Sequence, residues 1–168
     1  MINPKIEKAF NDQINAELYS ASLYLSMAAY FDAKNFSGMA TWMKRQADEE
    51  MEHAMKFYSY IIDNGGKVHF KAIEAPPKTW KSTLEVFNTA YKHECKVTKL
   101  IHMLVDLAKK LNDHAASIFL QWFVTEQIEE EATVGEVIGR LRLFGDKPEG
   151  LLMIDTELGT AATQMASA

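Results

Sequence analysis

The chain has 168 residues, of which 48% are apolar, which is enough for one domain with a single buried core. Its net charge of −5, without a standout basic patch, argues against a nucleic-acid or anionic-membrane partner. The single cysteine, Cys95, excludes an intrachain disulfide and a cysteine metal cluster. With no signal-peptide run and no apolar stretch near the roughly 18 residues of a membrane span, we expect a cytoplasmic protein.

Helical periodicity dominates the sequence, and no convincing alternation of apolar and polar residues predicts a strand. A first helix is expected from Pro4, which suits a first-turn position, to about Phe31. A second is expected to start with Ser37 as its N-cap and to stop at Asn64-Gly65-Gly66.

The third helix is expected to open with the capping box Ser82-Thr83-Leu84-Glu85 and to run to about Leu111. After a break at Asn112-Asp113, a fourth helix should reach Phe144-Gly145. A short fifth helix is expected from Pro148 to Gly159, followed by a frayed tail from Thr160 to Ala168. The predicted class is all-α, in one domain over residues 1–168.

The segment from Gly65 to Lys81 is long for a connection without secondary structure, and Pro76-Pro77 makes it extended. Fully extended, it spans on the order of 50 Å. The second helix is about 40 Å long. The segment can therefore cross the full length of a bundle, which predicts a four-helix bundle with a long crossover between helices two and three.

Polar side chains interrupt the inward stripe of every long helix, at positions whose neighbours in the stripe are apolar or aromatic (among them Leu25 and Tyr91). They are Glu17 on the first helix, Glu50 and His53 on the second, Glu94 on the third, and Gln127 and Glu130 on the fourth. Glu50 and His53 are three residues apart and so share a face. All six lie at a similar number of residues from the turns near residues 34 and 112, which places them at one height along the bundle. We therefore expect them to converge at mid-bundle.

Four carboxylates in a core are very costly unless they are neutralised, and two divalent cations would cancel their charge of −4. One histidine among oxygen ligands suits iron, manganese or zinc better than calcium or magnesium. A metal pair that reduces O₂ by two electrons makes iron the natural choice. For any one of these glutamates alone, a surface position or a paired core charge is the commoner explanation. That explanation fails for all four together, because no Lys or Arg shares the inner stripe at these levels.

The sequence resembles bacterial and archaeal non-haem ferritins over nearly its whole length. The matching stretches are Asn15-Ala16-Glu17-Leu18-Tyr19, Glu49-Glu50-Met51-Glu52-His53-Ala54-Met55, His93-Glu94, Phe119-Leu120-Gln121-Trp122-Phe123, Glu126-Gln127-Ile128-Glu129-Glu130-Glu131 and Ile154-Asp155-Thr156-Glu157-Leu158, with Ala75-Pro76-Pro77 in the crossover.

The resemblance implies that Glu17, Glu50 and His53 hold a first iron, and that Glu50, Glu94 and Glu130 hold a second. Gln127 would then be a nearby group that lies either just behind the ligands or on the substrate side. A third iron position would be formed by Glu49, Glu126, Glu129 and Glu130, and it rests mainly on analogy. Tyr24 matches the family's site tyrosine, an electron donor or radical site; a core tyrosine hydrogen-bonded to a carboxylate is an equal alternative, and both roles can coexist. Trp122 matches a family position too, and we assign it to packing.

Neighbouring families are distinguished by their motifs. Bacterioferritins and di-iron oxygenases usually repeat Glu-x-x-His on the fourth helix, where this chain has Gln127-x-x-Glu130. Met51 occupies the place of the bacterioferritin haem ligand, but nine methionines make packing the simpler role, and no haem is expected. Mini-ferritins lack the fifth helix.

The resemblance therefore implies a 24-subunit homo-oligomeric cage that oxidises Fe(II) with O₂ or peroxide and stores ferric oxyhydroxide. The histidines outside the stripe, His69, His93, His102 and His114, are expected at the surface or in interfaces, with His114 a candidate for an iron entry pore. Two rival functions are a di-iron oxidase or peroxidase for an organic substrate, and a non-enzymatic helical scaffold. The first needs an apolar pocket beside the metals, and the second does not explain four inward glutamates.

Overall fold

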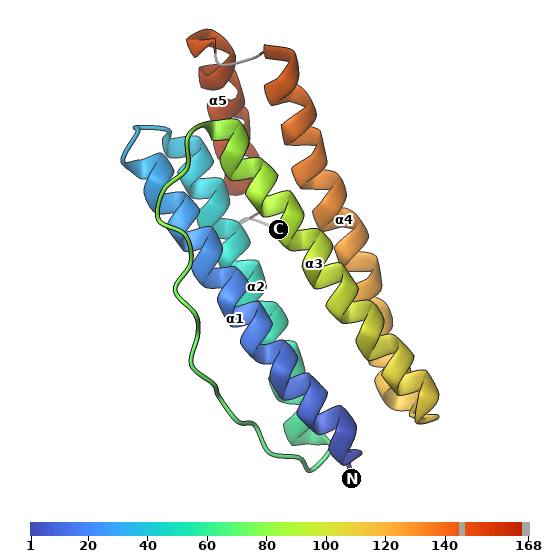
Figure 1. Cartoon of the computed structure of the whole chain (residues 1–168). Helices are drawn as coiled ribbons and strands as arrows, with labels where there is room; N and C mark the ends of the chain where they lie inside the picture. The colour runs from blue at the N-terminus through green and yellow to red at the C-terminus, as the bar shows by residue number, and fades with distance from the viewer. Residues whose placement is uncertain (145–146, 166–168) are drawn as a thin grey trace.

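The computed structural model describes residues 1–144 and 147–165. The helices in chain order are α1 (Pro4–Asp32), α2 (Ser37–Asp63), α3 (Thr83–Lys110), α4 (His114–Phe144) and α5 (Pro148–Met165), and they are the only regular secondary structure of the described residues. The four long helices lie side by side, with α5 packed at one end of the bundle (Figure 1). The expected all-α bundle, with its crossover and its short fifth helix, is confirmed.

Side chains from the adjoining loops cap three of the helices. Asn3 accepts a hydrogen bond from the Lys5 amide at 2.9 Å at the start of α1. The predicted capping residue Ser82 accepts one from the Glu85 amide at 3.1 Å at the start of α3. Asp113 accepts one from Ala116 at 3.0 Å at the start of α4. These acceptors satisfy amide groups that a helix leaves unpaired at its first turn.

The start of α2 differs from the prediction, because Ser37 is its first helical residue rather than its N-cap. The cap residue is Phe36, and it offers no side-chain acceptor. The acceptor comes instead from α5, where Asp155 Oδ1 binds the Met39 amide at 2.8 Å in a buried position. A carboxylate at a helix N-terminus also benefits from the helix dipole.

The expected stop of α5 at Gly159 is wrong, since α5 continues to Met165. The glycine serves packing instead of termination. A Cβ at Gly159 would lie 3.0 Å from the Gly38 Cα, and a Cβ at Gly38 would lie 1.8 Å from the Asp155 carbonyl oxygen. The two helix backbones therefore approach more closely than any side chain allows. Of the predicted frayed tail, Thr160 to Met165 is helical and residues 166–168 lie outside the described part of the chain.

The crossover between α2 and α3 runs along the bundle beside α1 (Figure 1). Near its start, the Asn11 amide donates to the Lys67 carbonyl at 3.0 Å and accepts from the His69 amide at 2.6 Å. Near its end, Ser26 donates to the Pro77 carbonyl at 2.5 Å. Because the crossover meets α1 in the same order as α1 runs, α3 begins at the end of the bundle where α1 finishes.

The interior contains two apolar clusters separated by a polar layer. One cluster is built from Leu23–Phe31, Met39–Ala47, Val86–Ala90, Val134–Leu141 and α5, and the other from Ile2–Ile14, Ala54–Ile61, Val97–Ala108 and Ala116–Phe123. Each long helix contributes residues to both clusters. The six predicted polar residues lie in the layer between the two clusters. The packing of both apolar clusters therefore determines the height of the polar layer along the bundle.

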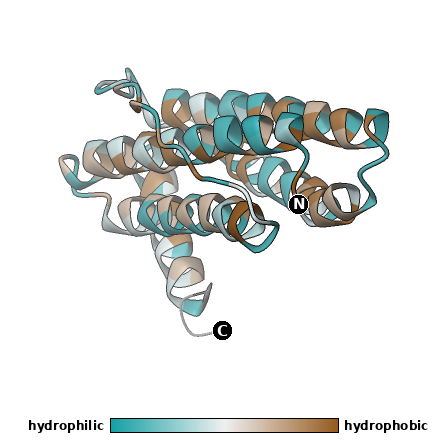
Figure 2. Cartoon of the chain, turned by 90° about the horizontal axis from the view of Figure 1, so that it is seen from below, coloured by the Kyte–Doolittle hydropathy of each residue, from teal (hydrophilic) through white to brown (hydrophobic). Residues whose placement is uncertain are grey.

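Two members of the predicted stripes lie outside the core. Leu25 is 53% exposed and Tyr91 is 36% exposed. The buried face of α1 contains the preceding residue Tyr24 instead, and the buried face of α3 contains Ala90. Figure 2 shows hydrophilic and hydrophobic residues mixed along the helices, as amphipathic helices require. No helix among the described residues has the length and apolar character of a membrane span.

The contact between α2 and α5 predicts a stability difference between two glycines. Gly38→Ala should lower the melting temperature, because the added methyl meets the Asp155 carbonyl and overpacking costs about 1–3 kcal/mol. Gly139→Ala is the matched control, since nothing lies within 4 Å of a Cβ there and alanine favours the helix by about 1 kcal/mol. Thermal unfolding followed by circular dichroism measures both; equal melting temperatures would contradict the packing role of Gly38.

Candidate metal centre

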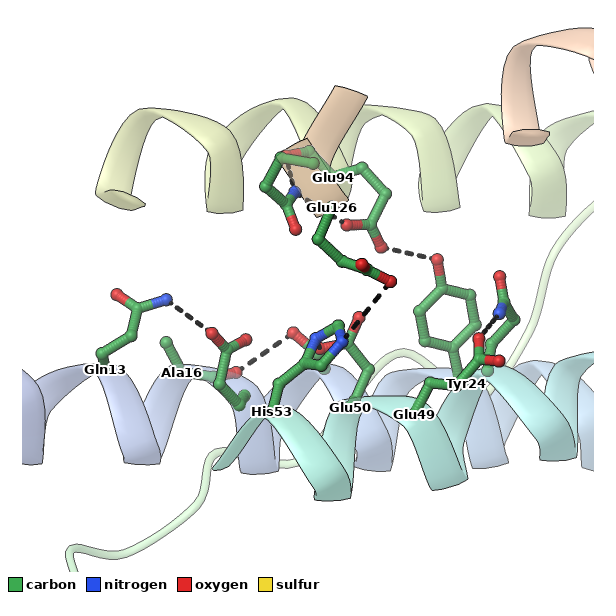
Figure 3. A network of polar contacts seen from close by, with 12 residues as sticks. Gln13, Ala16, Tyr24, Glu49, Glu50, His53, Glu94 and Glu126 are labelled. Carbon is green, nitrogen blue, oxygen red and sulfur yellow. Dashed lines mark hydrogen bonds and ion pairs between the residues drawn. The ribbon is translucent and has the colours of Figure 1, made fainter. Parts of the chain in front are cut away.

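All six predicted inward residues lie in the polar layer, and none is more than 6% exposed. They are Glu17 from α1, Glu50 and His53 from α2, Glu94 from α3, and Gln127 and Glu130 from α4. In Figure 3 Glu50 and His53 lie on the same helix, with Glu94 facing them from the other side of the layer. The predicted convergence in phase and depth is therefore present in the structure.

Glu17, Glu50 and His53 form a group that could hold a metal ion. One ligand atom from each lies within 4.8 Å of the others, and all three residues are buried. His53 Nδ1 lies 3.5 Å from Glu50 Oε2. Two carboxylates and one imidazole form a donor set that suits iron. This is the set expected for the first iron.

A second group combines His53 with Glu130 and Glu126. His53 Nε2 lies 3.9 Å from Glu126 Oε1, a pair drawn in Figure 3. Glu94 belongs to neither group. The assignment of Glu50, Glu94 and Glu130 to a second iron therefore stays a prediction.

Glu94 is held by neutral donors. The Tyr24 hydroxyl donates to Glu94 Oε1 at 2.5 Å, and Gln127 Nε2 lies 3.3 Å from Glu94 Oε2. Burial, followed by the charge of Glu94, raises the pKa of Tyr24 well above its usual value of 10. The geometry includes the carboxylate-bonded tyrosine that was one of the two alternatives for Tyr24.

Gln13, a residue that the sequence analysis missed, completes the surroundings of Glu17. Its Nε2 donates to Glu17 Oε1 at 2.9 Å, one helical turn away on α1. Glu17 Oε2 and Glu50 Oε2 remain buried without a hydrogen-bond partner. Such oxygens are costly in a core unless a proton or a cation neutralises them. The signal for Gln13 was its place four residues before Glu17, on the same face.

The protonation of the carboxyl groups follows from their burial. Desolvation raises the pKa of Glu17 to about 7 and, with the charge of Glu94, that of Glu130 to about 9. Desolvation and neighbouring carboxylates also raise the pKa of Glu50 well above its usual value. Burial lowers the pKa of His53 to about 4, so its imidazole is neutral near pH 7, the form that binds metals. A cation that binds here displaces protons from carboxyl groups.

The residues expected for a third iron position line a small cavity beside this layer. A space of about 100 Å³ is bordered by Glu49, Glu126, Glu129 and Glu130, together with Trp42, Gln46 and Thr133. The Gln46 amide donates to Glu49. Burial is the main cause that raises the pKa of both Glu49 and Glu126. The structure brings together the four carboxylates that the sequence analysis grouped.

An aromatic shell covers His53. Its ring lies edge-on to Trp122, with centroids 5.3 Å apart, and 6.0 Å from Phe123. Trp122 is 40% exposed, and Lys56 Nζ lies 4.3 Å above its ring. These contacts fit the packing role expected of Trp122.

The remaining histidines divide in a way that the sequence did not show. His69, His102 and His114 are exposed, as expected. His93 is half-buried instead, and its Nε2 lies 2.7 Å from Ser20 Oγ across the α1–α3 contact. Its burial lowers the pKa of His93 to about 4. No described contact tests the pore role expected of His114.

Comparison with known proteins agrees with this geometry. A family model described as the ferritin-like domain matches residues 7–144. The "Bacterial non-heme ferritin" of Bacteroides fragilis is 45% identical over 159 residues, which cover 95% of this chain and 99% of the relative. The chain belongs to the ferritin family.

Further ferritins support this membership. The "Bacterial non-heme ferritin" of Escherichia coli is 38% identical over 164 residues, covering 98% of this chain and 99% of the relative. Among solved structures, the open pore ferritin of the archaeon Archaeoglobus fulgidus superposes with a TM-score of 0.93 at 47% identity, covering 95% of this chain and 98% of that one. The resemblance inferred from the motifs is confirmed.

The raised carboxyl pKa values predict how this ferritin responds to pH without metal. Between about pH 4.5 and pH 9 the unfolded chain ionises Glu130 while the folded protein keeps it protonated, so stability should fall as pH rises. Glu130→Gln cannot ionise, and its melting temperature should fall less than that of the parent protein over this range. Thermal unfolding of the chelator-treated proteins measures the difference, with exposed Glu136→Gln on α4 as control. Parallel pH profiles for parent and Glu130→Gln would contradict a raised pKa.

Proposed function

We propose that this ferritin is a ferroxidase that oxidises Fe(II) with O₂ or peroxide and stores the ferric product. The observation that carries the proposal is the buried group of Glu17, Glu50 and His53, with Glu94 and Glu130 in the same layer. Membership of the ferritin family and relatives named non-heme ferritin support iron as the metal.

In this proposal iron is the substrate, and the protein supplies orientation and charge. Glu17, Glu50 and His53 bind one Fe(II), and Glu50, Glu94 and Glu130 bind the second, so that Glu50 is shared. Each Fe(II) gives one electron, and two electrons with two protons convert O₂ to H₂O₂. The carboxylates stabilise Fe(III) more than Fe(II), because attraction grows with ionic charge.

Protons and electrons have identifiable sources beside the site. Carboxyl groups with raised pKa, such as Glu17 at about 7, release protons when Fe(II) binds. Tyr24, hydrogen-bonded to Glu94, is placed to donate an electron through that contact. Gln127 holds Glu94 from the other side.

A third iron would bind at the cavity bordered by Glu49, Glu126, Glu129 and Glu130. Glu130 borders both this cavity and the main layer, and His53 reaches Glu126 at 3.9 Å. The third position is therefore adjacent to the first two, and it provides a route by which oxidised iron leaves them.

We further propose a homo-oligomeric cage of 24 subunits, which the family resemblance implies. Large apolar side chains remain exposed on the single chain, including Leu25, Ile62, Phe70, Ile118 and Ile128. Apolar surface of this kind is commonly buried by subunit contacts.

The rival function, oxidation of an organic substrate, needs an apolar pocket beside the metals. The cavity described next to the ligands is small, and four carboxylates border it. Such a space attracts cations and repels apolar molecules. The geometry therefore favours iron as the substrate.

Loss of the proposed ligands should abolish rapid iron oxidation. Glu50→Ala and His53→Ala remove groups of the buried site and should lower the initial rate of aerobic Fe(II) oxidation by at least about 100-fold. Glu52→Ala, an exposed glutamate between them, is the control and should keep the parent rate. Ferric absorbance after mixing with Fe(II) measures the rate. Oxidation at the parent rate in both variants would refute the site assignment.

Iron storage is tested by measuring the mass of the assembled particle and the amount of iron that it retains. The subunit is 19.0 kDa, so a cage elutes in size-exclusion chromatography as a particle of many subunits. After aerobic loading, the purified particle should retain far more iron than its ligand sites can bind. Elution as a monomer or dimer, or iron limited to two or three atoms per chain, would favour the rival functions.

A further inference from the structure

A chain of hydrogen bonds links the buried site to the outer edge of the α3–α4 contact. The Thr98 hydroxyl on α3 donates to Glu131 Oε1 on α4 at 2.6 Å. Gln127 Nε2 lies 3.3 Å from Thr98 Oγ1, and also 3.3 Å from both Glu94 Oε2 and the Glu94 carbonyl. Glu131 is half-buried and borders a surface groove with Tyr91 and Arg142.

Thr98 is unusual among the helical threonines of this chain. The hydroxyls of Thr41, Thr89, Thr125 and Thr156 each donate to the carbonyl four residues earlier in their own helix. That arrangement is the local default for threonine in a helix. The Thr98 hydroxyl donates to Glu131 on α4 instead of to a carbonyl of its own helix. The Glu131 carboxylate therefore determines the direction of this hydroxyl.

The Thr98 hydroxyl and the Glu94 carbonyl both constrain which way the Gln127 amide points. A hydroxyl has one hydrogen, and that of Thr98 is committed to Glu131, an acceptor when ionised. Thr98 Oγ1 can then only accept from Gln127, so the NH₂ group and not the carbonyl must face it. The amide nitrogen and oxygen diverge from one carbon, and Gln127 Oε1 is therefore turned away from Thr98. Without Glu131, the Thr98 hydroxyl could donate instead, and only the Glu94 acceptors would then hold the amide in this orientation.

The orientation matters because Gln127 is 3% exposed and shares its face of α4 with Glu130. An amide oxygen attracts a cation, whereas an NH₂ group repels it. The contact of Gln127 with the Glu94 carboxylate weakens when that carboxylate binds iron, which leaves the Glu94 carbonyl and Thr98 as acceptors for its NH₂ group. The contact with Thr98 persists, since Thr98 and Glu131 belong to neither metal-binding group of the described residues.

We propose that Thr98, held by Glu131, is a positioning residue that fixes the orientation of the Gln127 amide beside Glu94, with its NH₂ group facing Thr98 and its oxygen turned away. The inference rests on the proposed ferroxidase function and extends it to two residues outside the ligand set. It gives Glu131, which follows the Gln127-x-x-Glu130 motif, a structural role other than that of a solvated acidic residue.

The test compares Thr98→Val with Thr98→Ser. Valine keeps the shape and removes the hydroxyl, and serine restores it. Thr89→Val is the matched control, because Thr89 is also half-buried on α3 but bonds its own helix. Glu131→Ala removes the group that fixes the hydroxyl, with exposed Glu136→Ala as its control.

Anaerobic titration with Co(II), followed by visible absorption and calorimetry, reports binding without turnover. Thr98→Val and Glu131→Ala should weaken the weaker of the two Co(II) binding steps about tenfold, the low end for residues that orient metal ligands. The same variants should raise the half-saturating Fe(II) concentration of aerobic oxidation and leave the maximal rate nearly unchanged. Thr98→Ser and both controls should match the parent protein, and melting temperatures should show that every variant is folded.

Parent-like Co(II) binding in Thr98→Val would overturn the positioning role. Failure of Thr98→Ser to restore binding, or equal weakening in Thr89→Val, would do the same, because either result points to packing. If the parent protein neither bound Co(II) in this layer nor oxidised Fe(II), the proposed function itself would fall, and this inference with it.

Discussion

The organisation of this protein depends on one electrostatic constraint: four glutamates from four helices share a buried layer in which the described residues include no lysine or arginine. Desolvation and mutual repulsion raise the pKa values of these carboxyl groups, to about 7 for Glu17 and about 9 for Glu130. In the absence of metal the layer is tolerated because protons neutralise it. In the proposed function, cations take the place of these protons, so the feature that weakens the fold is also the one that binds iron.

The rest of the bundle holds that layer in place. Apolar clusters lie on either side of it, and every long helix contributes to both. The crossover, tied to α1 by Asn11 and Ser26, lets α3 start at the end where α1 finishes. If α3 instead began at the end where α2 finishes, Glu94 would still lie on an inward face of α3 but at a different height along the bundle. The topology is therefore part of the site.

Neutral donors bind two of these four carboxylates. Gln13 binds Glu17, and Tyr24 and Gln127 bind Glu94. An arginine in any of these places would neutralise part of the charge of the layer permanently and would compete with the cations of the proposed function. Amides and a phenol orient the oxygens while leaving their charge available, and they leave Glu17 Oε2 and Glu50 Oε2 without a partner.

The sequence by itself determined the helices, the crossover and the inward polar residues, because helical phase and distance from a turn are local properties. Glu17, Glu50, His53, Glu94, Gln127 and Glu130 followed from that phase alone. Only the tertiary structure decided which atoms meet across helices. It joined Glu126 to His53, used Asp155 to cap α2, made Gly159 a packing residue and turned Thr98 toward Glu131. Those contacts depend on the rotation and offset of one helix against another, which periodicity within a single helix does not contain.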